Sequence, residues 1–141
     1  MIVRLILALA APLAMAVQDV PPRSGEEPTV GAVCLWAIYN TLDQVGKRCH
    51  SGEDAALQAF VAEGAGRLDR VLIDKGGLTE AQLDKFKREQ TGTDMPDAEF
   101  CKAEGPGGFY GPARSQDIDG MRRDLEKVLA RPGKPVWGDC L

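Results

Sequence analysis

His50 is the only histidine of the 141-residue chain, and it directly follows Cys49, one of four cysteines. A cysteine–histidine pair can attach haem, but that attachment requires Cys-x-x-Cys-His, and Gly46 stands where the first cysteine belongs. A zinc site would require pairs of ligands a few residues apart in the sequence. Neither Cys34 nor Cys101 has a second cysteine or histidine within four residues. We therefore expect no metal and no cofactor, and we expect His50 to lie on the solvent side of a connection before a helix.

The four cysteines are better suited to disulfides, because small exported proteins commonly use disulfides to stabilise a limited core. If residues 29–45 form a helix, Cys34 lies about 16 Å from its end, at 1.5 Å per residue. Cys49 cannot return that distance in four residues, since bonded Cα atoms approach to about 6 Å, so Cys34–Cys49 is disfavoured. Antiparallel packing favours Cys49–Cys101, which leaves Cys34–Cys140. The pairing Cys34–Cys101 with Cys49–Cys140 stays open.

Carboxylates are plentiful, and two of them across a cleft could hydrolyse a glycosidic bond. The candidates are Glu53, Asp54, Glu63, Asp69, Asp74, Glu80, Asp84 and Glu89. Most of these carboxylates are explained by a structural role, either at the start of a helix or in an exposed ion pair. A Ser-His-Asp triad would depend on His50, and no Gly-x-Ser-x-Gly elbow is present. A small secreted hydrolase of cell-wall glycan or lipid, using paired carboxylates or His50, is therefore the alternative function.

Phe109 and Tyr110 lie within the segment 105–112, which reads GPGGFYGP. Its glycines and prolines predict a loop. It is no phosphate-binding loop, because it follows no predicted strand and contains no lysine. Aromatic residues on loops often contact protein partners, so we predict Phe109 and Tyr110 as a possible partner contact. The alternative is that both rings fold under and cover the core, and Trp36 and Trp137 are expected at the core edge.

The stretch 29–50 carries two of the four cysteines and His50, so its structure determines where they lie. Its apolar side chains recur at steps of three and four, which predicts one buried face of a helix; they are Val30, Val33, Cys34, Ala37, Ile38, Leu42 and Val45. Thr29 is the predicted N-cap and Gly46 the predicted end of this helix. Asn40 falls outside the apolar face.

Further helices are predicted after this stretch. Ser51 is the candidate N-cap of the second, and Gly64 with Gly66 predicts a break, because two glycines cost a helix about 2 kcal/mol. A second segment then runs over 66–74 and ends at Gly76-Gly77. Thr79 and Gln82 form a capping box for the next helix.

The C-terminal part completes the prediction. A short helical turn is expected over 96–101, and Ser115 is the candidate cap of a last helix that ends before Pro132. No segment shows a convincing strand pattern. The predicted fold class is all-α, a small bundle of four to five helices with two disulfides.

The N-terminus resembles a secretory signal. Arg4 precedes an apolar run that closes with Ala14-Met15-Ala16, and the run is shorter than the roughly 20 residues of a membrane-spanning helix. We predict a signal peptide at 1–16, a flexible leader at 17–28 and a single helical domain at 29–141.

The predicted mature chain is acidic. Cleavage of the signal peptide removes Arg4 and leaves 16 basic against 21 acidic residues, a net charge of −5. An acidic chain without a polybasic run is not expected to bind nucleic acid, or a membrane after signal cleavage.

These features favour a periplasmic or secreted helical protein that binds an unknown protein partner and performs no catalysis. The partner could be an enzyme that it inhibits or an envelope complex that it joins. A structural envelope protein without a specific partner is a further possibility.

Overall fold

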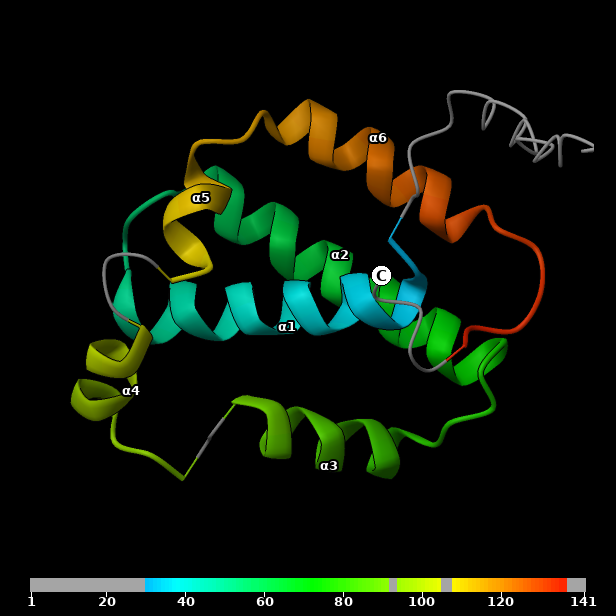
Figure 1. Ribbon diagram of the computed structural model, residues 1–141, viewed down its shortest axis with the longest axis horizontal. Helices are drawn as coiled ribbons and strands as arrows, with labels where there is room; N and C mark the ends of the chain where they lie inside the picture. Colours follow the sequence, from blue (N-terminus) through cyan, green and yellow to red (C-terminus); the bar gives the residue numbers. More distant parts are fainter. Residues whose placement is uncertain (1–29, 92–93, 105–107, 137–141) are drawn as a thin grey trace, which may run out of the picture.

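The computed structural model describes residues 30–91, 94–104 and 108–136 (Figure 1). Within these ranges the chain forms six helices and no strand, which confirms the all-α class but exceeds the predicted four to five helices. The helices are α1 (Ala32–Cys49), α2 (Ala55–Asp74), α3 (Glu80–Thr91), α4 (Asp97–Glu104), α5 (Tyr110–Arg114) and α6 (Ile118–Leu129). The predicted signal peptide and leader lie outside the described residues and stay predictions.

Helix α1 is the central element, and each of the other five helices packs against it. In Figure 1, α6 lies above α1 and α3 below it, α2 crosses α1 diagonally, and α4 and α5 lie beside the carboxyl end of α1. The buried apolar residues come from α1, α2, α3, α5 and α6. None of the helices in these described ranges is both long enough and apolar enough to span a bilayer.

Both ends of α1 differ from the sequence prediction. The helix begins at Ala32 with Gly31 as its N-cap, not at a cap on Thr29, and it continues through Gly46 to Cys49. A Cβ atom at position 46 would lie 3.1 Å from Cε2 of Tyr110, in α5. Gly46 therefore permits close packing between helices instead of ending one.

The buried face of α1 matches the predicted one only in part, because Val33, Leu42 and Val45 alone of the predicted residues are fully buried. Trp36 and Tyr39 are each 2% exposed, whereas Val30 is 40% exposed. Asn40, expected among the polar residues, is buried, and its side-chain amide donates a hydrogen bond of 2.8 Å to the carbonyl of Trp36. This bond satisfies part of its amide group, as burial of a polar side chain requires.

Asp69 in α2 joins three helices through its two carboxylate oxygens. Trp36 in α1 donates its indole N–H to Oδ1 at 2.7 Å, and the ammonium group of Lys87 in α3 pairs with Oδ2. Trp36 therefore lies in the core, with its polar atom satisfied by a neighbouring helix, and not at the core edge as predicted.

Helix α2 is continuous across the two glycines that were predicted to break it. A Cβ atom at Gly64 would lie 2.6 Å from Cε1 and 2.8 Å from Cδ1 of Tyr39. Gly64 is thus a point of close approach between α2 and the Tyr39 ring of α1, where a side chain would not fit. The predicted start is wrong as well, because the N-cap is Asp54 and not Ser51.

The turn between α2 and α3 follows the sequence prediction. Gly77 has a φ of +73°, a conformation that favours glycine, and α2 ends just before it. The Thr79 N–H donates to Oε1 of Gln82 at 2.9 Å, and the Gln82 N–H donates to Oγ1 of Thr79 at 3.2 Å. The predicted capping box is confirmed.

Two local predictions in the C-terminal part are wrong. The segment 105–112 is not a loop throughout, because Tyr110 opens α5, while residues 105–107 lie outside the described ranges. Asp117, and not Ser115, caps α6, since its carboxylate accepts hydrogen bonds from the N–H groups of Asp119 and Gly120 at 3.3 and 2.9 Å. Carboxylates at an N-cap also interact favourably with the helix dipole.

The buried phenol of Tyr39 gives the fold a predictable response to alkaline pH. Burial, followed by the nearby charge of Asp124, raises the pKa of Tyr39 to about 12 from 10.0. Because the folded state holds the proton more tightly than the unfolded state, stability is fully present below pH 10.0 and is lost as pH rises toward 12. The expected loss from this residue is up to about 2–3 kcal/mol.

The measurement is urea unfolding of the wild type and of Tyr39→Phe at several pH values from neutral to 12. The variant keeps the ring against Gly64 but carries no titrating hydroxyl. We expect the wild type to lose stability more steeply than the variant above pH 10. Parallel profiles would contradict the assignment.

Candidate functional site

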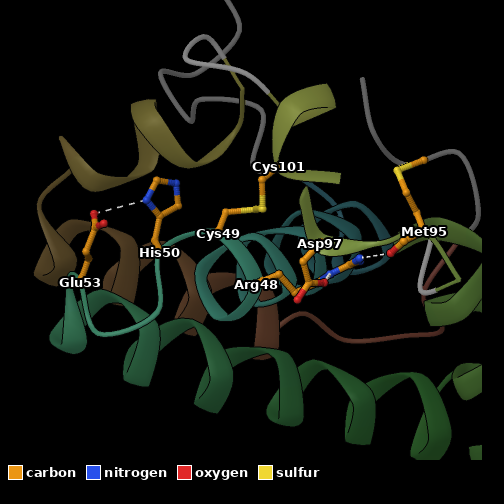
Figure 2. Close-up of a disulfide and its surroundings, with 7 residues drawn as sticks. All are labelled: Arg48, Cys49, His50, Glu53, Met95, Asp97 and Cys101. Carbon is orange, nitrogen blue, oxygen red and sulfur yellow. Dashed lines mark hydrogen bonds and ion pairs between the residues drawn. A yellow bond between two sulfur atoms is a disulfide. The ribbon is translucent and has the colours of Figure 1, made fainter. Parts of the chain in front are cut away.

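A disulfide joins Cys49, the last residue of α1, to Cys101 in α4, with a Cα–Cα distance of 5.5 Å (Figure 2). This confirms Cys49–Cys101, one of the two disulfides of the favoured pairing, and excludes the alternative of Cys34–Cys101 with Cys49–Cys140. Cys140 lies outside the described residues, so the pairing Cys34–Cys140 stays a prediction. No cysteine in the described ranges is a free thiol.

His50 lies directly after this disulfide, in the connection between α1 and α2, as predicted. Its surroundings are not simply solvent, because the imidazole ring stacks on the ring of Tyr110 with centroids 4.3 Å apart and planes at 6°. Its Nδ1 atom is 3.3 Å from Oε2 of Glu53 (Figure 2). The side chain is 27% exposed, so one face of the ring is covered by α5.

Arg114 of α5 completes this group of side chains by pairing with two carboxylates of the connection. Its Nη2 atom lies 3.1 Å from Oε2 of Glu53 and 2.9 Å from Oδ2 of Asp54. We call His50, Glu53, Asp54, Tyr110 and Arg114 the histidine cluster. Asp54 has a φ of +45°, in the left-handed region, so the backbone is strained where the chain enters α2.

Gln58 in the first turns of α2 holds the connection in place. Its side-chain amide donates to the carbonyl oxygens of His50 and Glu53 at 2.8 and 2.7 Å. Burial raises the pKa of the Tyr110 phenol, while the neighbouring side chain of Gln58 acts in the opposite direction. The backbone of residues 50–53 is therefore fixed by a side chain from the helix that follows it.

A shallow pocket of about 240 Å³ opens beside the histidine cluster. Residues 54–57 at the start of α2 line one wall, and Ala113, Arg114, Gln116 and Ile118 line the other. Its size is below the roughly 300–1,000 Å³ of typical small-molecule pockets. Arg114 faces it while paired with two carboxylates, so the pocket presents no strong net charge.

Phe109 and Tyr110, the two residues of the predicted partner contact, lie in different environments. Tyr110 is 2% exposed and lies in the core, whereas Phe109 is 60% exposed. The two rings therefore do not form one surface patch, and Phe109 alone is accessible. Phe109 precedes α5 directly, so a buried neighbour fixes the backbone that carries it.

The carboxylates of the histidine cluster differ in arrangement from those of a glycosidase. A glycosidase places two carboxyl groups across a substrate cleft. Glu53 and Asp54 are instead adjacent in sequence and share Arg114 as their partner. Within the described ranges, no group of three or more His, Cys, Asp or Glu side chains is placed to hold a metal ion. Hydrolysis by paired carboxylates or by His50 stays an untested prediction.

Two arginines were missed by the sequence interpretation. Arg48 binds α4, with Nε 2.7 Å from Oδ1 of Asp97 and the guanidinium 3.9 Å from the ring centroid of Phe100. Arg114 holds the histidine cluster. Their partners in other elements lie 47 to 61 residues away in sequence, so no local pattern could indicate them.

No model of a protein family matches this chain, and no significant similarity to a curated protein or to a solved structure was found.

Proposed function

We propose that the protein is an exported helical module that binds another protein through the surface around Phe109. The observation that carries the proposal is the contrast between two adjacent aromatic residues, one exposed and one buried. Large aromatic side chains often supply most of the binding energy of an interface. A side chain presented on a fixed backbone loses little conformational entropy on binding, which favours affinity.

The surroundings of Phe109 support its role as a fixed anchor. Tyr110 is held by stacking on His50, and His50 lies beside the disulfide at the end of α1. Arg114, at the other end of α5, pairs with Glu53 and Asp54. Phe109 thus projects from a short helix that is attached to the bundle at both of its ends.

Export to the periplasm or the cell exterior belongs to the same proposal. The disulfide between Cys49 and Cys101 is compatible with an oxidising compartment. The apolar N-terminal run followed by Ala14-Met15-Ala16 is typical of a cleaved signal.

The test compares capture of envelope proteins by the immobilised wild type, by Phe109→Ala and by Val136→Ala. Val136 is 63% exposed and apolar, so it is a matched control for the loss of exposed apolar surface. We expect Phe109→Ala to weaken capture of a specific protein by about tenfold or more, as for an interface anchor. Val136→Ala should capture it like the wild type. Equal capture by all three proteins would contradict the proposal.

A further inference from the structure

Helix α4 is attached to the bundle in an unusual way, because it contributes no buried side chain among its described residues. It packs chiefly on α1. Phe100 and Cys101 are its half-buried residues, and its other described side chains are exposed. Eight residues are also too few for a helix that is stable by itself in water. Helix α4 therefore depends on its attachment to α1.

The attachment combines one covalent bond, one arginine and the half-buried ring of Phe100, which packs against the edge of the core (Figure 2). The disulfide fixes Cys101 to Cys49, while Arg48 bonds to Asp97 and to the carbonyl of Met95. The guanidinium also lies over the ring of Phe100. The side chain of Asp97 is 68% exposed and that of Arg48 is 12% exposed, so water reaches the ion pair from the Asp97 side and weakens it.

We infer that the Cys49–Cys101 disulfide is a redox latch, which holds α4 on α1 when oxidised and releases α4 when a dithiol reduces it, while the rest of the bundle stays folded. Among the described residues, all fully buried apolar side chains belong to other helices, and α4 adds only the half-buried Phe100 and Cys101 at the edge of the core. Both cysteines are half-buried, so the disulfide is not enclosed by the core. Release would uncover Arg48 and the carboxyl end of α1.

The chemistry is thiol–disulfide exchange with a dithiol reductant. A thiolate of the reductant attacks Sγ of Cys101, a mixed disulfide forms, and Cys49 leaves as a thiolate that takes up a proton. The second thiol of the reductant then displaces Cys101. Two electrons pass to the two cysteines, which become thiols, and the reductant becomes a disulfide.

The first test treats the native wild-type protein with dithiothreitol, alkylates the free thiols and maps the labelled cysteines by mass spectrometry. We expect Cys49 and Cys101 to be labelled without denaturant. Labelling of these two residues only after denaturation would overturn the inference, because the disulfide would then be inaccessible in the folded protein.

The second test measures amide hydrogen exchange in the double variant Cys49→Ser with Cys101→Ser, which leaves Cys34 and Cys140 intact. We expect exchange in α4 to accelerate by about tenfold or more, as for a locally opened segment, while α2 keeps its protection. Unchanged exchange in α4 would overturn the inference. Loss of protection in α2 as well would also overturn it, since the disulfide would then support the whole bundle.

Arg48→Gln, with the disulfide intact, is the matched control. It removes the ion pair with Asp97 but keeps the covalent bond. We expect α4 to remain protected in this variant. If Arg48→Gln released α4 as fully as the double serine variant does, the arginine and not the disulfide would hold the helix, and the inference would be wrong.

Discussion

Replacing Tyr110 with alanine is expected to lower the free energy of unfolding by about 3–5 kcal/mol, the range for removing a large aromatic side chain from a core. The residue is among the largest fully buried side chains of the described chain. Its ring stacks on His50 and lies close to Gly46, so its loss would open a cavity between α1 and α5. Urea unfolding followed by circular dichroism measures the change.

Phe109→Ala is the matched control for this prediction, because it removes a neighbouring aromatic ring that is 60% exposed. We expect a change within about 0.5–1 kcal/mol, as for most surface substitutions. Tyr110→Phe should retain most of the stability, since the ring remains in place. If Phe109→Ala and Tyr110→Ala lowered the free energy of unfolding by similar amounts, the exposed position of Phe109 and the buried position of Tyr110 would both be in doubt.

Gly64→Leu is expected to destabilise the protein by about 3 kcal/mol or more, at the upper end of overpacking effects. Even the first added atom, Cβ, would lie 2.6 Å from the ring of Tyr39. That ring is itself packed edge-to-face on Phe60, with centroids 5.8 Å apart, so it has little room to move. The free energy of unfolding from urea titration gives the magnitude.

Gly66→Ala provides a control of opposite sign in the same helix. A Cβ atom at position 66 meets nothing within 4 Å, so alanine should add only its higher helix propensity. We expect a gain of about 1 kcal/mol. If substitutions at both positions were stabilising, α2 and Tyr39 would not be in the close contact described above.

These two glycines also show where sequence interpretation reaches its limit. Gly64 and Gly66 both read as helix breakers, because propensity is a local property. The ring that requires a glycine at position 64 belongs to Tyr39, 25 positions earlier in the chain. Gly46 was misinterpreted for the same reason, since its partner Tyr110 is distant in sequence.

Features whose partners are local were predictable. The capping box of Thr79 and Gln82 could be predicted because the interacting residues are three positions apart. The disulfide between Cys49 and Cys101 spans 52 positions, so antiparallel packing of the helices could only favour it, and a second pairing stayed open. By contrast, the histidine cluster forms from two distant segments, so sequence alone placed His50 in its connection but could not indicate its stacking on Tyr110.

The bond between Trp36 and Asp69 gives the protein an internal optical probe. The indole is buried and held by a carboxylate from α2, so its fluorescence should report whether α1 and α2 remain in contact. Trp137 is the other tryptophan of the chain, and replacing it with phenylalanine would leave Trp36 as the sole tryptophan. Because α4 lies at the opposite end of α1 from the α2–α3 turn, such a signal would follow unfolding of the central helices separately from detachment of α4.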